Sequence, residues 1–282
     1  MCDTPGLRRI CKESYNDPAE VYHRCKRLGM AIVTLTDHDS IDSAEVLRKH
    51  PDFFLSEEVT VQMPTGTRMH LGVYGITEKD HAEIQRRRND FIALLMYLTE
   101  RKLFFTANHM FSSLTGRRNL EDFDWFASYL PAFEVRNGQM WREANRQADQ
   151  MAVKLGKARV AGSDSHTLAG VAQTFTEVPR ARTVEEFFTG LRAGCGIVHG
   201  EDGSFLKITR DIFRFAGCLL NEKPAVAAAL LPLAPFIPAV TGFHWINEIR
   251  FCKRWTSQLQ RTEKAPRMLW DVDSRFEANW AS

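Results

Sequence analysis

The residues of this chain best suited to chemistry are histidines and carboxylates that fall in or just after short apolar runs. They are Asp37, His38, Glu57, Glu58, His70, His109, Asp164 and His166. Imidazole nitrogens and carboxylate oxygens are ligands for divalent zinc, manganese or iron, and one carboxylate can bridge two such ions. Two ions held close together lower the pKa of a shared water and neutralise the charge that develops on a phosphoryl group. The pattern therefore favours metal-assisted hydrolysis of a phosphate ester over a set of unrelated structural histidines.

The elements that must position these side chains alternate along the chain. Apolar and β-branched runs typical of buried strands occupy 31–36, 53–61, 69–76, 103–108, 132–137, 158–163 and 172–178. Helical patterns occupy 18–29, 77–101, 119–130, 139–155 and 184–194. Asp17 and Thr183 are the predicted N-caps of the first and the last of these helices. The alternation predicts a parallel α/β architecture, in which the carboxyl ends of the strands converge on one face and bring distant residues together.

Five segments resemble motifs of the PHP (polymerase and histidinol phosphatase) family. TLTDHDSID at 34–42 resembles a strand that runs into Thr-Asp-His, and SEEVTV followed by MHLGVYGI resembles the family's glutamate strand and the histidine strand after it. ANHMFSS resembles a strand ending in Ala-His-Pro, with Met110 in place of the proline. GSDSHTLAG resembles the closing Gly-Ser-Asp-x-His motif, and the similarity extends over about residues 17–200.

The resemblance implies a distorted (β/α)7-type PHP barrel and a metal-dependent phosphoesterase. The ligands that carry over to divalent Mn, Zn or Fe are His38, Glu58, His70, His109, Asp164 and His166. Glu58 would bridge two ions, and Glu58, Asp164 and His166 would take part in catalysis by a metal-bound hydroxide. The expected substrate is a small phosphorylated metabolite or a nucleotide.

The chain departs from the family pattern at its beginning. PHP proteins open with a strand ending in His-x-His, whereas the only histidine in the first thirty residues here is His23, in the middle of a predicted helix. Met1 to Asn16 resembles the loop that follows the missing first strand. Two interpretations stay open: an enzyme whose start is assigned too far downstream, which we prefer, or a catalytically impaired PHP domain that acts as a structural or regulatory module.

Three further residues are candidates for roles beside the metal ligands. Asp37 is expected to orient an imidazole, and Glu134 in FEVRNG resembles a family segment near the active face. Arg117, with Arg118, follows His109 in a loop where guanidinium groups could bind a substrate phosphate, although exposed solvated charge explains them equally well. Glu57 is expected on the opposite strand face from Glu58, and Asn137-Gly138 is interpreted as a turn.

The chain is expected to divide near residue 200 into a PHP domain, 1–200, and a mostly helical C-terminal extension, 201–282. Within the extension, 225–240 is apolar but contains Pro232, Pro235 and Pro238, which would break a regular membrane-spanning helix. We interpret it as a packed or interfacial segment. A transmembrane hairpin, which would make the chain a membrane-associated accessory protein, is the less favoured alternative.

Composition and net charge limit the classes of partner and the cellular compartment that we expect. The net charge of +2 and a pI near 8.2 show no basic field that would indicate a nucleic-acid partner. Six cysteines without Cys-x-x-Cys spacing, and no secretory signal, predict a reduced cytoplasmic compartment. Nothing in the sequence predicts the oligomeric state.

Overall fold

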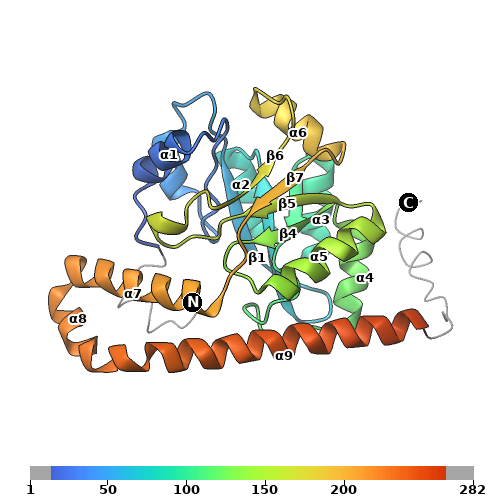
Figure 1. Ribbon diagram of the computed structural model, residues 1–282. Coiled ribbons are helices and arrows are strands. Elements are labelled where there is room, and N and C mark those ends of the chain that lie inside the picture. The colour runs from blue at the N-terminus through green and yellow to red at the C-terminus, as the bar shows by residue number, and fades with distance from the viewer. Residues whose placement is uncertain (1–13, 265–282) are drawn as a thin grey trace, which may run out of the picture.

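Five strands form one mixed sheet in the computed structural model, which describes residues 14–264 (Figure 1). In sheet order they are β1 (Ser56–Gln62), β2 (Arg68–Tyr74), β3 (Phe104–Ala107), β4 (Ala132–Asn137) and β5 (Ala158–Gly162). β2 is antiparallel to both of its neighbours, whereas β3, β4 and β5 are parallel. A separate antiparallel pair consists of β6 (Thr174–Glu177) and β7 (Ile197–Gly200).

Helices cover the sheet and form the C-terminal part of the described chain. They are α1 (Pro18–Arg27), α2 (Glu78–Arg87), α3 (Phe91–Glu100), α4 (Leu120–Tyr129), α5 (Arg142–Leu155), α6 (Val184–Arg192), α7 (Phe205–Glu222), α8 (Pro224–Leu230) and α9 (Ile237–Lys264). Short 3-10 turns are η2 (Asp42–Leu47), η3 (Leu168–Gly170) and η4 (Leu231–Phe236). Asp17 and Thr183 cap α1 and α6 as predicted, since their side chains accept hydrogen bonds from Glu20 N and Glu186 N.

Two expected elements differ from the sequence pattern. The single helix expected over 77–101 is two helices, because Asp90 accepts a hydrogen bond from Ala93 N and caps a new start at α3. The strand expected over 31–36 makes isolated parallel bridges, Val33 with Phe53 and His38 with Glu58, instead of a continuous ladder. Parallel pairing is thus limited to one bridge at Phe53, ahead of β1, and one at Glu58, within β1.

The closed parallel barrel is not confirmed. β1 and β2 are joined by a tight turn in which Met63 N donates to Thr67 O and Gly66 has a φ of +82°. So short a connection forces an antiparallel hairpin, because a parallel pair needs a crossover of a dozen residues or more. The fold is therefore a mixed α/β fold whose parallel part, among the described residues, is limited to β3, β4 and β5 and three isolated bridges, at Phe53, at Glu58 and between Trp141 and Gly203.

The described part of the extension, 201–264, is mostly helical as expected, whereas 265–282 lie outside the described residues, and burial differs along the described part. The C-terminal half of α9 packs against the domain, where Cys252 and Trp255 are buried and the Trp255 ring lies 5.7 Å from that of Phe123. The segment 225–240 was expected to be packed against the protein or interfacial. The expectation of packing is wrong for the large side chains named next. Leu230, Leu231, Leu233, Phe236 and Val240 are all exposed.

Candidate metal centre

Glu58 lies at the middle of a group of imidazoles. Its Oε2 is 3.2 Å from Nε2 of His38, and its Oε1 is 3.7 Å from Nδ1 of His70. One ligand atom from each of these three residues lies within 4.8 Å of those from the other two. The strand register produces this meeting, because Glu58 pairs with Gly72 and His70 with Thr60, so that the two side chains are diagonal neighbours on one sheet face.

Gly72 leaves the space that this arrangement needs. A Cβ at this position would lie 2.4 Å from the Tyr74 hydroxyl and 2.8 Å from Oγ1 of Thr106. Thr106 in turn donates to Oδ1 of Asn108 over 2.6 Å, and Asn108 Nδ2 donates to Glu58 Oε1 over 2.7 Å. The glycine therefore allows a polar relay to reach the carboxylate from behind.

His109 joins the group from the end of β3. Its Nε2 lies 2.9 Å from His70 Nδ1, and its Nδ1 lies 3.3 Å from Oε2 of Glu134 in β4. The backbone N–H of His109 also donates to this glutamate oxygen, over 3.0 Å. His109 has a φ of +31°, an unfavourable value for a residue with a side chain, of the kind found where structure holds a functional group in place.

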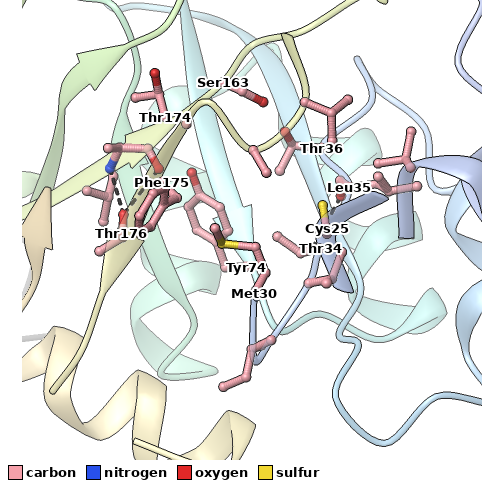
Figure 2. Close-up of a pocket in the computed structure, with 18 of the residues that line it drawn as sticks. Cys25, Met30, Thr34, Leu35, Thr36, Tyr74, Ser163, Thr174, Phe175 and Thr176 are labelled. Atoms are coloured by element: carbon pink, nitrogen blue, oxygen red, sulfur yellow. Dashed lines mark hydrogen bonds between the residues drawn. The ribbon is translucent and has the colours of Figure 1, made fainter. Parts of the chain in front are cut away.

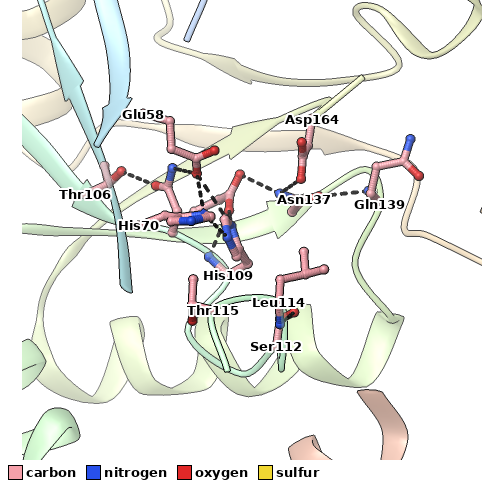
Figure 3. A network of polar contacts seen from close by, with 12 residues as sticks. Glu58, His70, Thr106, His109, Ser112, Leu114, Thr115, Asn137, Gln139 and Asp164 are labelled. Atoms are coloured by element: carbon pink, nitrogen blue, oxygen red, sulfur yellow. Dashed lines mark hydrogen bonds and ion pairs between the residues drawn. The ribbon is translucent and has the colours of Figure 1, made fainter. Parts of the chain in front are cut away.

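Asp164 and His166 complete the set after β5. Asn137 Nδ2 lies 3.0 Å from both Glu134 Oε1 and Asp164 Oδ2 and so links the two carboxylates (Figure 3). His166 Nδ1 lies 4.0 Å from Asp164 Oδ1, and Asp164 has a φ of +45°. All six ligands implied by the motifs, with Glu134, therefore belong to one continuous chain of contacts.

The strand ends meet by a different route from the one expected. His109 and Asp164 do follow the carboxyl ends of β3 and β5, but His70 lies near the amino end of β2. Because β2 runs in the opposite direction, its first half reaches the same edge, where Asn108 N donates to His70 O over 3.0 Å. The antiparallel hairpin thus places His70, from the amino end of β2, at the edge of the sheet where a parallel strand would place a residue from its carboxyl end.

Burial and the contacts among the side chains decide which members of the cluster carry a charge. Burial raises the pKa of Glu58, against the opposing effect of His109 and His38. Burial, together with the neighbouring imidazoles, lowers the pKa of His70 far below its ordinary value. Burial would also lower the pKa of His109, but the hydrogen bond to Glu134 and the nearby carboxylates outweigh it and raise the pKa to about 9. His109 is therefore the imidazolium, which donates from Nε2 to neutral His70 and from Nδ1 to Glu134.

The donor set fits a divalent cation. Ligand atoms about 2.0–2.2 Å from a tetrahedral ion lie about 3.3–3.6 Å from one another. The separations of 3.2 Å and 3.7 Å from Glu58 to His38 and His70 match this spacing. The two oxygens of Glu58 face different imidazoles, Oε2 that of His38 and Oε1 that of His70.

The other candidate residues have mixed outcomes. The Asp37 carboxylate accepts a hydrogen bond from the Ser43 hydroxyl, and its expected role in orienting an imidazole stays a prediction. Arg117 is exposed, whereas Arg118 is buried and donates to Arg68 O over 2.7 Å. Glu57 faces away from the cluster and contacts His81 Nδ1 at 2.9 Å, as strand alternation predicts.

Two residues of the site were missed in the sequence. Asn137 was interpreted as a turn residue, and Asn108 received no role, although Asn108 donates to Glu58 and Asn137 links Glu134 to Asp164. Both asparagines are the last residue of a predicted strand; Asn108 directly precedes His109, and Asn137 lies three residues after Glu134. That position is the only signal that could have identified them.

A cavity of about 1410 Å³ adjoins the cluster (Figure 2). His38, Glu58 and Asp164 line part of it. Figure 2 shows segment 30–36 on one side and β6 with Phe175 on the other, with Tyr74 between them. The cavity therefore presents apolar walls together with the polar cluster, and it exceeds the about 300–1,000 Å³ of ordinary small-molecule sites.

Comparison with known proteins supports one family. A family model described as PHP-associated matches residues 142–195. A two-domain protein from Bacteroides vulgatus that contains a predicted PHP-like metal-dependent phosphoesterase shares the fold, with a TM-score of 0.54, 14% identity, and coverage of 73% of this chain and 67% of that one. PsfC from Pseudomonas syringae gives a TM-score of 0.53, 15% identity, and coverage of 71% and 88%. No curated protein matches the sequence. The family match over residues 142–195 supports the PHP family that the motifs predict, and the solved structures share the fold.

Proposed function

We propose that this chain is a metal-dependent phosphoesterase that hydrolyses a small phosphate ester or a nucleotide. The observation that carries the proposal is the convergence of His38, Glu58 and His70 within 4.8 Å of one another beside a large cavity. The PHP-associated family match and the fold shared with a PHP-like protein support a metal-dependent hydrolase. The substrate class comes from the chemistry of the donor set, which suits ions that neutralise phosphoryl charge.

Each residue has a definite part in this proposal. His38, Glu58 and His70 would hold one Mn, Zn or Fe ion, and His109, Asp164 and His166, farther along the same contacts, are the candidate ligands of a further one. Bound ions would supply a hydroxide at neutral pH and neutralise charge on the phosphoryl group. Asn137 and Glu134 would hold the imidazole of His109 and the carboxylate of Asp164 in place. The apolar walls of the cavity would exclude water around the organic part of the substrate.

The alternative is a catalytically impaired domain that acts as a structural or regulatory module. One observation favours it: the cluster is satisfied without an ion, because both ring nitrogens of His109 and both oxygens of Glu134 have partners. Such a module would bind metal weakly or not at all. A membrane-associated role is independent of this choice.

The test is a metal count followed by an activity screen. The full chain is purified, loaded with Mn²⁺, Zn²⁺ or Fe²⁺, and its bound ions are counted by mass spectrometry. A panel of phosphate monoesters and nucleotides is then assayed with added Mn²⁺. We expect bound metal and turnover that His109→Ala reduces by a hundredfold or more, a range common for altered metal sites.

The matched control is His23→Ala, because His23 is exposed on α1 and away from the cluster. It should keep full metal content and activity. A folded chain that retains no metal rejects the enzyme, and metal without turnover on any phosphate ester favours the impaired module.

A further inference from the structure

The helices at the end of the described chain expose an uncharged apolar tip. Between Pro224 and Asn247 there is no Asp, Glu, Lys or Arg. This stretch comprises α8, η4 and the beginning of α9. Figure 1 shows it as the turn of a helical hairpin between α7 and α9, which extends to the left of the domain.

The exposure of this tip is extensive. Leu231 is 68% exposed, Phe236 61% and Phe243 66%. Val240 and Phe243 are three residues apart on α9, so they lie on one helical face, and Phe236 is the last residue of η4 before that helix begins. Only 6% of the most apolar window in Pro224–Thr262 is buried, and by length and composition this helical stretch could cross a membrane. A core helix of a soluble domain would bury most of such a window, so the fold does not explain the composition.

The charges that follow the apolar tip are those that anionic lipid headgroups attract. Arg250, Lys253 and Arg254 are exposed on α9 immediately after the uncharged stretch. The one acidic residue among them, Glu248, is buried and accepts hydrogen bonds from the backbone and hydroxyl of Ser113. Trp245 lies between the apolar and the basic parts, where aromatic residues are enriched at membrane interfaces.

The geometry favours insertion into one leaflet over crossing the bilayer. The uncharged part of α9, Ile237 to Asn247, would span about 16 Å at about 1.5 Å per residue, against a hydrocarbon core of about 30 Å. The preceding residues do not extend it, because the 3-10 turn η4, which contains Pro235, bends the chain back toward α7.

We propose that α8, η4 and the first turns of α9 dock onto the surface of an anionic lipid bilayer, with Leu231, Phe236 and Phe243 in the outer part of one leaflet and Arg250, Lys253 and Arg254 among the headgroups. The proposal does not depend on the proposed hydrolase activity. The packed half of α9, with Trp255 against Phe123, would then hold the domain at the bilayer.

The test is co-sedimentation of the full chain with vesicles of phosphatidylcholine that contain phosphatidylglycerol. We expect the chain to sediment with these vesicles, and less so at high salt. Combining Leu231→Glu, Phe236→Glu and Phe243→Glu should weaken the partition at least tenfold. The matched control combines Met96→Glu and Val153→Glu, which charge exposed apolar residues of α3 and α5, and should bind as the unaltered chain does.

Two further measurements distinguish other occupants. Brominated lipid should quench tryptophan fluorescence, and Trp245→Phe should remove most of this quenching while binding persists. Alkaline carbonate should release the bound chain, whereas resistance to it would overturn leaflet docking in favour of a span. The proposal is also wrong if the chain stays in the supernatant. It is equally wrong if light scattering shows that the unaltered chain is a dimer and the triple variant a monomer, while neither protein binds vesicles. Unchanged melting and metal content of the triple variant would show that it is folded.

Discussion

Nδ1 of His70 lies 2.9 Å from Nε2 of His109, and the two rings meet edge to face with centroids 5.0 Å apart. Such an approach of two imidazoles needs a proton or a metal ion between or beside them, because two lone pairs would repel. In the metal-free protein, His109 carries the additional proton, as its raised pKa requires. A cation bound at the same place would substitute for that proton.

The stability of the metal-free protein should depend on this proton. The folded-state pKa of His109, about 9, lies above the ordinary value of about 6.5, so its contribution is fully present below pH 6.5 and is lost as pH rises through 9. With a chelator present, the difference in melting temperature between the unaltered chain and His109→Gln should shrink from pH 6 to pH 9.5. A constant difference would contradict the placement of the proton.

Metal affinity should increase with pH for the same reason. A metal ion that binds His109 must displace its proton, so the apparent affinity should rise up to about tenfold per pH unit below pH 9. Calorimetric titration of Mn²⁺ or Zn²⁺ in two buffers of different ionisation enthalpy would count the released protons. His109→Gln should release fewer, and equal release from both proteins would assign the displaced proton to another residue.

Asn137 should be more important for stability than its place in a turn suggests. It links the buried carboxylate of Glu134 to Asp164, so Asn137→Ala leaves both without this donor and should cost about 1–3 kcal/mol in urea unfolding. Asn137→Asp should cost more without metal, because it places a third carboxylate between two others. If Asn137→Asp is as stable as the unaltered chain under chelation, the linking role is wrong.

Glu248 should connect the C-terminal helix to the metal centre. Its Oε1 lies 3.0 Å from Ser113 N, in the loop that follows His109, where Ser112 N also donates to His109 O. Glu248→Ala should loosen this loop and reduce metal affinity by about tenfold. Equilibrium dialysis against Zn²⁺ would measure this, with exposed Glu185→Ala on α6 as the control. Undiminished affinity would show that the loop holds its position without α9.

Much of the site was predictable because it depends on local sequence. His38, Glu58, His70, His109, Asp164 and His166 were all implied by motifs, and the structure brings all of them together. The helix starts at Asp17 and Thr183 follow from capping chemistry that involves only neighbouring residues. The helical nature of the extension was likewise evident from composition and pattern.

Only the tertiary structure decided what depends on pairing between distant segments. The reversed direction of β2, the roles of Asn108 and Asn137, and the high pKa of His109 arise from contacts across the sheet, which no periodicity within one segment encodes. The same holds for the apolar stretch after Pro224, since composition is the same for a buried and an exposed helix. The reason is that sequence specifies which side chains are available over a few residues, whereas burial and charge depend on what the rest of the chain places beside them.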